Sequence, residues 1–348
     1  MSLELSKHAA GVDVDEMKAP AGYVVEDPDL VAAANAAIAL GKPLLLTGEP
    51  GIGKSEFARW LAAQTPACDL LEFVVKSTTD AGDLFYQFDA LARFRDAQLQ
   101  SLKQAQAPLP GGAPKTDRER RHELHKYLRY NALGMAILRS QGREKAEQAD
   151  FISPTLGDTY RDFPVEPARS VVLIDEIDKA PRDVPNDILD EILHRRFRVT
   201  ELDGIEARAD QAHSPIVVIT SNSERDLPKP FLRRCIYYHM RLSKDPAALH
   251  RIAERRMGSR FLGNETLLGD CIQLFLHLRG SVRLAHQPGL AELLDWLAEL
   301  ARRAPTPGAR LASLDHGRSS LKTALLKEAR DQQRADEEWP AWLKDSSV

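Results

Sequence analysis

One stretch near the amino terminus combines residue types that bind phosphate groups. Residues 44–55 read LLLTGEPGIGKS, in which Gly48, Gly53, Lys54 and Ser55 match the spacing G-x-x-x-x-G-K-[ST]. Glycine permits backbone angles that point successive N–H groups at one anion. A lysine adds a mobile positive charge for the outer phosphates, and a serine hydroxyl binds Mg²⁺. The stretch predicts a nucleoside triphosphate site, and a structural glycine turn is the alternative. The predicted phosphate-binding residues are Gly48, Glu49, Pro50, Gly51, Ile52, Gly53, Lys54, Ser55 and Glu56.

A second stretch places two acidic residues at the end of an apolar run. Residues 170–181 read SVVLIDEIDKAP, so Asp175 and Glu176 directly follow four aliphatic residues, as in a strand buried on both faces. Acidic residues at the carboxyl end of such a strand face the ligand crevice. We expect Asp175 to hold Mg²⁺, with Ser55, and Glu176 to polarise the water that attacks the γ-phosphate. A surface acidic turn is the alternative.

Two further positions fit the same chemistry. Asn222 ends the apolar run SPIVVITSN, where its amide would orient the attacking water or contact the γ-phosphate, although a strand-end cap has the same pattern. Arg233 and Arg234 precede the last strand in LPKPFLRRCIYYHMRL. Either they are surface charges, or a guanidinium reaches the γ-phosphate in a neighbouring subunit.

These residues need a scaffold that gathers strand ends at one edge. Apolar strands alternate with helical patterns from residue 28 to residue 242, which predicts an α/β fold: a P-loop NTPase with a doubly wound, parallel, five-stranded sheet. Strand patterns then stop, and a small all-α domain follows. The predicted organisation is an arm over 1–25, a core over 26–242, a helical lid over 243–325 and a helix with a polar tail over 326–348.

The core contains an insert at about 78–150. It carries the aromatic residues Phe85, Tyr86, Phe88 and Phe94, then a Pro/Gly loop at 107–114 that we expect to be flexible, then a charged helix from Tyr127 through Leu138. A hairpin is predicted over Arg196 to Ala212, turning at Asp203-Gly204.

Composition narrows the choice of partner and compartment. The 348 residues carry a formal net charge of −4, which makes nucleic acid an unlikely main partner, although the basic stretch Arg118 to Arg129 leaves that function open. The three cysteines are far apart and fit neither a disulfide framework nor a zinc site. The start has no signal-peptide pattern, and no apolar run is long enough to span a bilayer. We expect a cytoplasmic protein without membrane association.

In order along the chain, GEPGIGKS, DEIDKAP, ITSN and LPKPFLRRC, followed by a helical region, resemble the motifs of an AAA+ ATPase, with the MoxR-type branch as the nearest pattern. The resemblance implies a ring, usually a hexamer, with ATP and Mg²⁺ between subunits. It makes Lys54 and Ser55 the Walker A pair, Asp175 and Glu176 the Walker B pair, and Asn222 the first sensor. Arg234 becomes the arginine finger, with Arg233 in reserve. The second sensor departs from the family pattern, and Arg283 or His286 would replace it.

The resemblance also implies a function: a motor that remodels or activates a protein client, in some relatives with a partner that bears a von Willebrand factor A domain. The aromatic insert and the hairpin would contact such a partner or pack against the lid. Two other functions stay open, an ATP-gated assembly switch in defence or signalling and an AAA+ protein that acts on nucleic acid.

Overall fold

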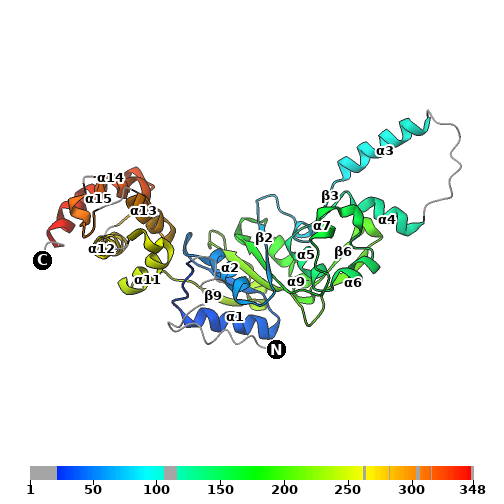
Figure 1. Cartoon of the computed structure of the whole chain (residues 1–348), viewed down its shortest axis with the longest axis horizontal. Coiled ribbons are helices and arrows are strands. Elements are labelled where there is room, and N and C mark those ends of the chain that lie inside the picture. The colour runs from blue at the N-terminus through cyan, green and yellow to red at the C-terminus, as the bar shows by residue number, and fades with distance from the viewer. Residues whose placement is uncertain are drawn as a thin grey trace. The chain divides into compact units, whose positions relative to one another are not determined.

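The computed structural model describes residues 22–105, 116–261, 264–281, 283–302, 306–314 and 316–345. The chain forms two compact units, which we describe separately. The first unit contains Ala33–Leu46 and Leu61–Tyr238, and the second contains the described residues up to Ala32, Thr47–Trp60 and the residues from His239 onward. Figure 1 labels many of the helices and strands of both units.

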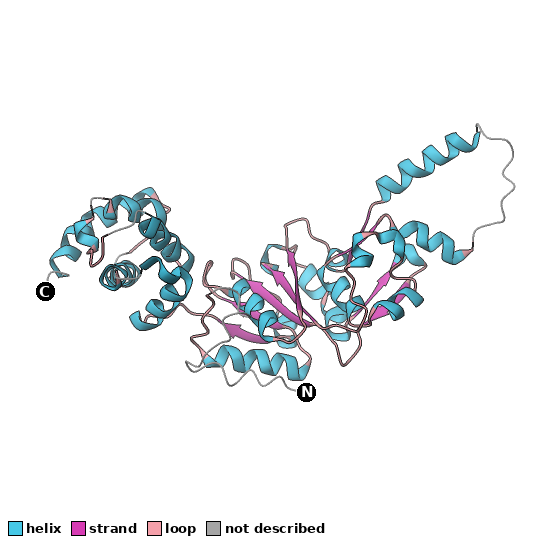
Figure 2. Ribbon diagram, in the orientation of Figure 1, coloured by secondary structure: helices cyan, strands magenta, loops and turns pink. Residues whose placement is uncertain are grey.

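A five-stranded parallel sheet is the framework of the fold. Its strands are β2 (Asp69–Val74), β5 (Ser170–Asp175), β8 (Ile216–Ser221), β1 (Leu44–Thr47) and β9 (Ile236–His239), in that spatial order. Figure 2 draws the strands in magenta. The central strands β1, β5 and β8 are buried along almost their whole length, as their unbroken aliphatic sequences predict. This confirms the predicted P-loop NTPase fold and brings the carboxyl ends of β5, β8 and β1 to one edge.

Helices connect the strands, and the first of them is capped at both ends. The Asp27 carboxylate accepts the Asp29 N–H (2.9 Å) at the start of α1 (Pro28–Leu40), and Gly41 ends that helix with a φ of +64°. The remaining helices up to residue 234 are α2 (Lys54–Gln64), α3 (Ala90–Ala105), α4 (Asp117–His125), α5 (Ala132–Arg139), α6 (Arg143–Gln148), α7 (Asp158–Arg161), α8 (Val184–Asp187), α9 (Leu189–His194) and α10 (Lys229–Arg234).

The insert differs from the prediction in one element. The expected continuous helix from Tyr127 through Leu138 is wrong, because β4 (Leu128–Tyr130) pairs antiparallel with β3 (Tyr86–Phe88) before α5 begins. Leu128 and Tyr130 are buried while Arg129 between them is exposed, a two-residue period that belongs to a strand. The loop predicted at 107–114 lies outside the described residues.

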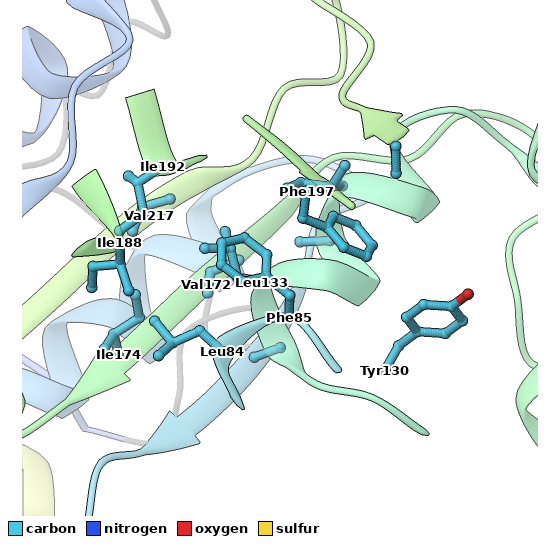
Figure 3. Packing of buried hydrophobic residues seen from close by; sticks show 14 of the residues in the cluster. Leu84, Phe85, Tyr130, Leu133, Val172, Ile174, Ile188, Ile192, Phe197 and Val217 are labelled. Carbon is cyan, nitrogen blue, oxygen red and sulfur yellow. The ribbon is translucent and has the colours of Figure 1, made fainter. Parts of the chain in front are cut away.

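The predicted hairpin is confirmed and packs with the aromatic residues of the insert. Its strands β6 (Arg196–Val199) and β7 (Ile205–Arg208) pair antiparallel, and Asp203 and Gly204 have φ values of 59° and 71° at the turn. The ring of Phe197 lies 5.4 Å from that of Phe85 in a stacked arrangement, within the buried cluster of Figure 3. The rings around Phe197 also include Tyr86, Tyr130 and Phe151.

The carboxyl-terminal region has its own core. Its helices are α11 (Pro246–Met257), α12 (Glu265–Ser281), α13 (Leu290–Arg302), α14 (Gly317–Ser320) and α15 (Ala329–Asp345). Trp296 is fully buried at its centre, and the indole N–H donates to the Ser320 hydroxyl (3.0 Å). The final helix α15 extends through most of the region for which the sequence predicts a helix with a polar tail. Among the described residues, no helix combines the length and apolar character needed to cross a membrane.

Phe197 should be among the residues on which the stability of the first unit most depends. Phe197→Ala removes a buried ring from an aromatic cluster, so we expect the free energy of unfolding to fall by about 3–5 kcal/mol. Phe94 is 59% exposed on α3 and serves as the matched control. Phe94→Ala should change stability by less than about 0.5 kcal/mol. Urea unfolding of the full chain measures both, and equal losses would contradict this assignment.

Candidate functional site

The glycine-rich loop joins β1 to α2 in the conformation that an anion cradle requires. Gly48, Gly51 and Gly53 have φ values of 144°, 71° and 100°, which side chains rarely allow. At Gly48 the space is also closed, because an added Cβ would lie 2.5 Å from the Met240 carbonyl oxygen. Lys54 is 6% exposed, and Nζ donates to the carbonyls of Gly48 (2.8 Å) and Glu49 (2.9 Å). The lysine ammonium therefore lies across its own loop.

Within the second unit, residues of the carboxyl-terminal helices form hydrogen bonds and ion pairs with the glycine-rich loop and the start of α2. The Ala291 N–H donates to the Gly51 carbonyl (3.2 Å), and Arg279 donates to both carboxylate oxygens of Glu49 (3.0 and 2.8 Å). In the first turn of α2, Glu56 pairs with Arg256 (2.9 Å). Burial raises the pKa of Glu56, but hydrogen bonds from Arg256 and Arg59 outweigh it, so the net pKa is lowered. Glu49 and Glu56 thus contact arginines here.

The carboxyl end of β5 carries the acidic pair, and one hydroxyl links its two members. Asp175 is the last residue of the strand, and Glu176 follows with a left-handed backbone (φ 61°, ψ 50°). The Thr220 hydroxyl of β8 donates to the Asp175 carboxylate (2.5 Å) and accepts the Glu176 N–H (2.9 Å). Left-handed angles are unfavourable for glutamate, so this bond helps to fix the turn.

Both carboxylate oxygens of Glu176 have polar partners. The Asn222 amide donates to Oε1 (3.1 Å), and the Lys179 ammonium donates to Oε2 (2.5 Å). Asp178, which is 4% exposed, accepts the backbone N–H groups of Asn222 (3.3 Å) and Glu224 (3.1 Å). The structure therefore brings together Asp175, Glu176 and Asn222, and Asp178 ties the turn after β5 to the turn after β8.

The predicted finger arginines lie elsewhere in the first unit. Arg233 and Arg234 end α10, and both are exposed. Within the described part of the chain, neither side chain forms an ion pair. This arrangement leaves both guanidinium groups accessible to another molecule.

The region proposed for the second sensor is anchored to α15. The buried Asp331 carboxylate accepts the N–H groups of Ala285 (2.8 Å) and His286 (2.9 Å), while the side chains of Arg283 and His286 are exposed. The arginine that contacts the glycine-rich loop is instead Arg279, through Glu49. The sequence signal for Arg279 was its place in the last turn of α12, shortly before the loop that leads to α13.

The basic face of α4 is largely neutralised by acidic residues. Arg118 and Arg121 pair with Asp150, and Lys126 pairs with Asp96. Arg120 pairs with Asp117. These contacts disfavour a phosphate-binding role for the stretch from Arg118 to Arg129.

The oxygen donors expected to bind Mg²⁺ are chemically suitable. Ser55 supplies a hydroxyl and Asp175 a half-buried carboxylate, the hard ligands that Mg²⁺ accepts together with phosphate oxygens and water. Within the described ranges, no cluster of three or more histidine, cysteine or acidic residues is arranged to hold a metal. A divalent cation bound by either residue would therefore need further ligands from phosphate or water.

Comparison with known proteins agrees with this geometry. The family model described as AAA domain (dynein-related subfamily) matches residues 43–235, which is more than half of the chain. A search of curated proteins finds no match.

Two similar solved structures are mutants of RuvB from Thermotoga maritima. The first, a proline-to-glycine mutant, has 14% sequence identity and a TM-score of 0.43, and the similarity covers 84% of this chain and 67% of that chain. The second, a threonine-to-valine mutant, has 15% identity and a TM-score of 0.40, with 85% and 67% covered.

The bridge that the Thr220 hydroxyl forms between Asp175 and the Glu176 N–H can be tested by measuring stability. Thr220→Val keeps the shape but leaves the Glu176 N–H without its acceptor, which should lower the free energy of unfolding by about 1–3 kcal/mol. Thr220→Ser retains the hydroxyl and should lose much less. Urea unfolding measures both variants, and a valine variant as stable as the serine variant would show that the hydroxyl bridge contributes nothing.

Proposed function

Because the chain belongs to the dynein-related subfamily of AAA domains, we propose that it is an ATP hydrolase that couples turnover to the remodelling of a protein client. The observation that carries this proposal is the arrangement around Glu176. An amide from Asn222 and an ammonium from Lys179 orient its carboxylate at the carboxyl edge of the sheet. A nucleotide-gated switch without turnover would have no need of a carboxylate held in this way.

In this proposal Glu176 accepts a proton from the attacking water, and the Asn222 amide helps to place that water in line with the γ-phosphate. The Lys179 ion pair is partly exposed, so its disruption costs little. Glu176 can therefore exchange Lys179 for water without loss of its backbone position, which Thr220 fixes.

ATP is assigned to the glycine-rich loop, because β1 leads directly into it and lies beside β8 in the sheet. The loop N–H groups and Lys54 would bind the phosphates, aided by the amino end of α2. Mg²⁺, held by Ser55 and Asp175, would neutralise charge on the outer phosphates. The ion pair of Arg279 with Glu49 would link the helical region to the glycine-rich loop. Arg279 would then take the second-sensor role that the sequence assigned to Arg283 or His286.

We place the active site between copies of the chain in a ring, with a hexamer as the expected form. Arg234 supplies the guanidinium that reaches the neighbouring γ-phosphate, and Arg233 is the reserve. Their exposure and lack of an ion pair within the described residues support this role. We assign the protein to the cytoplasm, without membrane association. Nucleic acid is not the expected partner.

We assign the client surface to α3, and not to all the aromatic residues of the insert. Phe85 is buried, and Tyr86 and Phe88 pack against the same core, so these rings serve the fold. Leu91, Phe94 and Leu99 are 58%, 59% and 56% exposed on α3. This apolar face would contact a client or a partner with a von Willebrand factor A domain, as expected for a MoxR-type protein.

The first test separates nucleotide binding from turnover. Lys54→Ala should abolish ATP binding, whereas Glu176→Gln should bind ATP and lower kcat by about 10²–10⁴-fold, because the amide cannot accept the proton. Equilibrium binding of a fluorescent ATP analogue and phosphate release measure the two properties. Glu166→Gln, at an exposed glutamate, is the control. Wild-type turnover by Glu176→Gln would refute the assigned role.

The second test asks whether the finger acts between copies. Arg234→Ala should bind ATP yet lose about 10³-fold or more of the turnover, because the transition-state charge is left uncompensated. Mixing Arg234→Ala with Lys54→Ala should restore part of the activity, since a Lys54→Ala copy can lend its arginine to an intact nucleotide site. Light scattering must show that the mixed oligomers form. Intact oligomers without any restored activity would contradict the placement, and Arg233→Ala then tests the reserve residue.

A further inference from the structure

A second concentration of positive charge lies at the opposite edge of the sheet, away from Asp175. Lys42 precedes β1, Arg169 precedes β5, and Ser214 and Pro215 precede β8, so the amino ends of three neighbouring strands meet there. These residues line a cavity of about 380 Å³ that Arg195 also enters from the turn before β6. Ala37 and Ile38 of α1 form its apolar wall. All of these residues belong to the first unit.

The cations of this cavity have no acidic partner among the described residues. No aspartate or glutamate lines the cavity, and Lys42, Arg169 and Arg195 form no ion pair with any described residue. Arg169 and Arg195 donate to backbone carbonyls, those of Ala212 (2.6 Å) and Gly41 (2.9 Å). Asp210, which directly precedes the lining residue Gln211, already accepts a hydrogen bond from the ring of His213 (3.0 Å) and two backbone N–H groups.

Arg195 shows that this arrangement carries an energetic cost. Burial lowers the pKa of its guanidinium, and repulsion from Arg169 lowers it further, with no acid acting in the opposite direction. Its Nε is buried without a hydrogen-bond partner, and its backbone is left-handed (φ 47°). Like charges held together in a partly buried hollow destabilise a protein unless an anion joins them.

We propose that Lys42, Arg169 and Arg195 form a binding site for a small polyvalent oxyanion of the phosphate class. Two guanidinium groups and an ammonium suit the oxygens of a tetrahedral dianion, whereas a single carboxylate would leave most of the charge uncompensated. The cavity volume is at the small end for organic ligands, which favours inorganic phosphate or a short phosphorylated molecule. Strand β5 separates Arg169 from Asp175 by roughly 20 Å. The anion is therefore distinct from the γ-phosphate of a bound nucleotide.

The test is a titration with inorganic phosphate at fixed ionic strength, with chloride as the balancing anion. It is performed on a Lys54→Ala background, so that the glycine-rich loop contributes little to the signal. Calorimetry should detect binding, and Lys42→Gln and Arg169→Gln should each weaken it at least tenfold. Lys42→Arg keeps the charge and should bind within about threefold of the parent. Lys145→Gln removes an exposed lysine of the same unit and should leave affinity unchanged.

Melting temperatures distinguish a lost anion site from a variant that binds phosphate weakly because its fold is damaged. Without phosphate, Lys42→Gln should melt at or above the melting temperature of its parent, because repulsion between the cations is relieved. Saturating phosphate should raise the melting temperature of the parent by about 5 °C but should not raise that of Lys42→Gln. An equal rise in both proteins, or no detectable binding by the parent at millimolar phosphate, would overturn the proposal.

Discussion

The functional region depends on the pairing of β5 with a strand on each side. β2 and β8 both run parallel to it, and the register sets Val74 beside Asp175 and Ile219 beside Ile174. A shift of this strand by one residue would exchange its two buried faces and disrupt the packing on both of them. Its carboxyl end is therefore fixed, and Asp175 emerges at one defined point on the edge of the sheet. Every polar contact around Glu176 builds on that position.

A glutamate in a left-handed turn would be costly without support, and two side chains from neighbouring positions provide it. Thr220 accepts the Glu176 N–H, and Asp178 accepts two backbone N–H groups from the turn after β8. The two turns therefore constrain each other, and the Asn222 amide is held near the Glu176 carboxylate. A rigid sheet edge thus determines the relative placement of a base and its orienting amide, as catalysis requires.

Much of this could be predicted from sequence, because the signals are local. Unbroken aliphatic runs indicate buried parallel strands, and glycine spacing indicates the loop at Gly48, Gly51 and Gly53. The residues that were missed act across the sheet. Thr220 and Asp178 look like ordinary strand and turn residues until β5 and β8 lie side by side, and the Arg279 contact with Glu49 joins distant segments. The error in the insert has a similar cause, because the short run at Leu128–Tyr130 pairs with a strand far away in sequence. The charge cluster of Lys42, Arg169 and Arg195 is likewise invisible along the chain, since only the topology of the sheet gathers its three segments.

The strand order also determines when the fold can form during synthesis. β1 ends at Thr47, but its neighbours in the sheet begin only at Ile216 and Ile236. A ribosome therefore releases the apolar segment Leu44–Leu46 long before the chain contains any strand that can pair with it. Long-range parallel pairing of this kind is slow and leaves apolar surface exposed. The strand that carries the glycine-rich loop is thus the part of the nascent chain that most needs protection from aggregation.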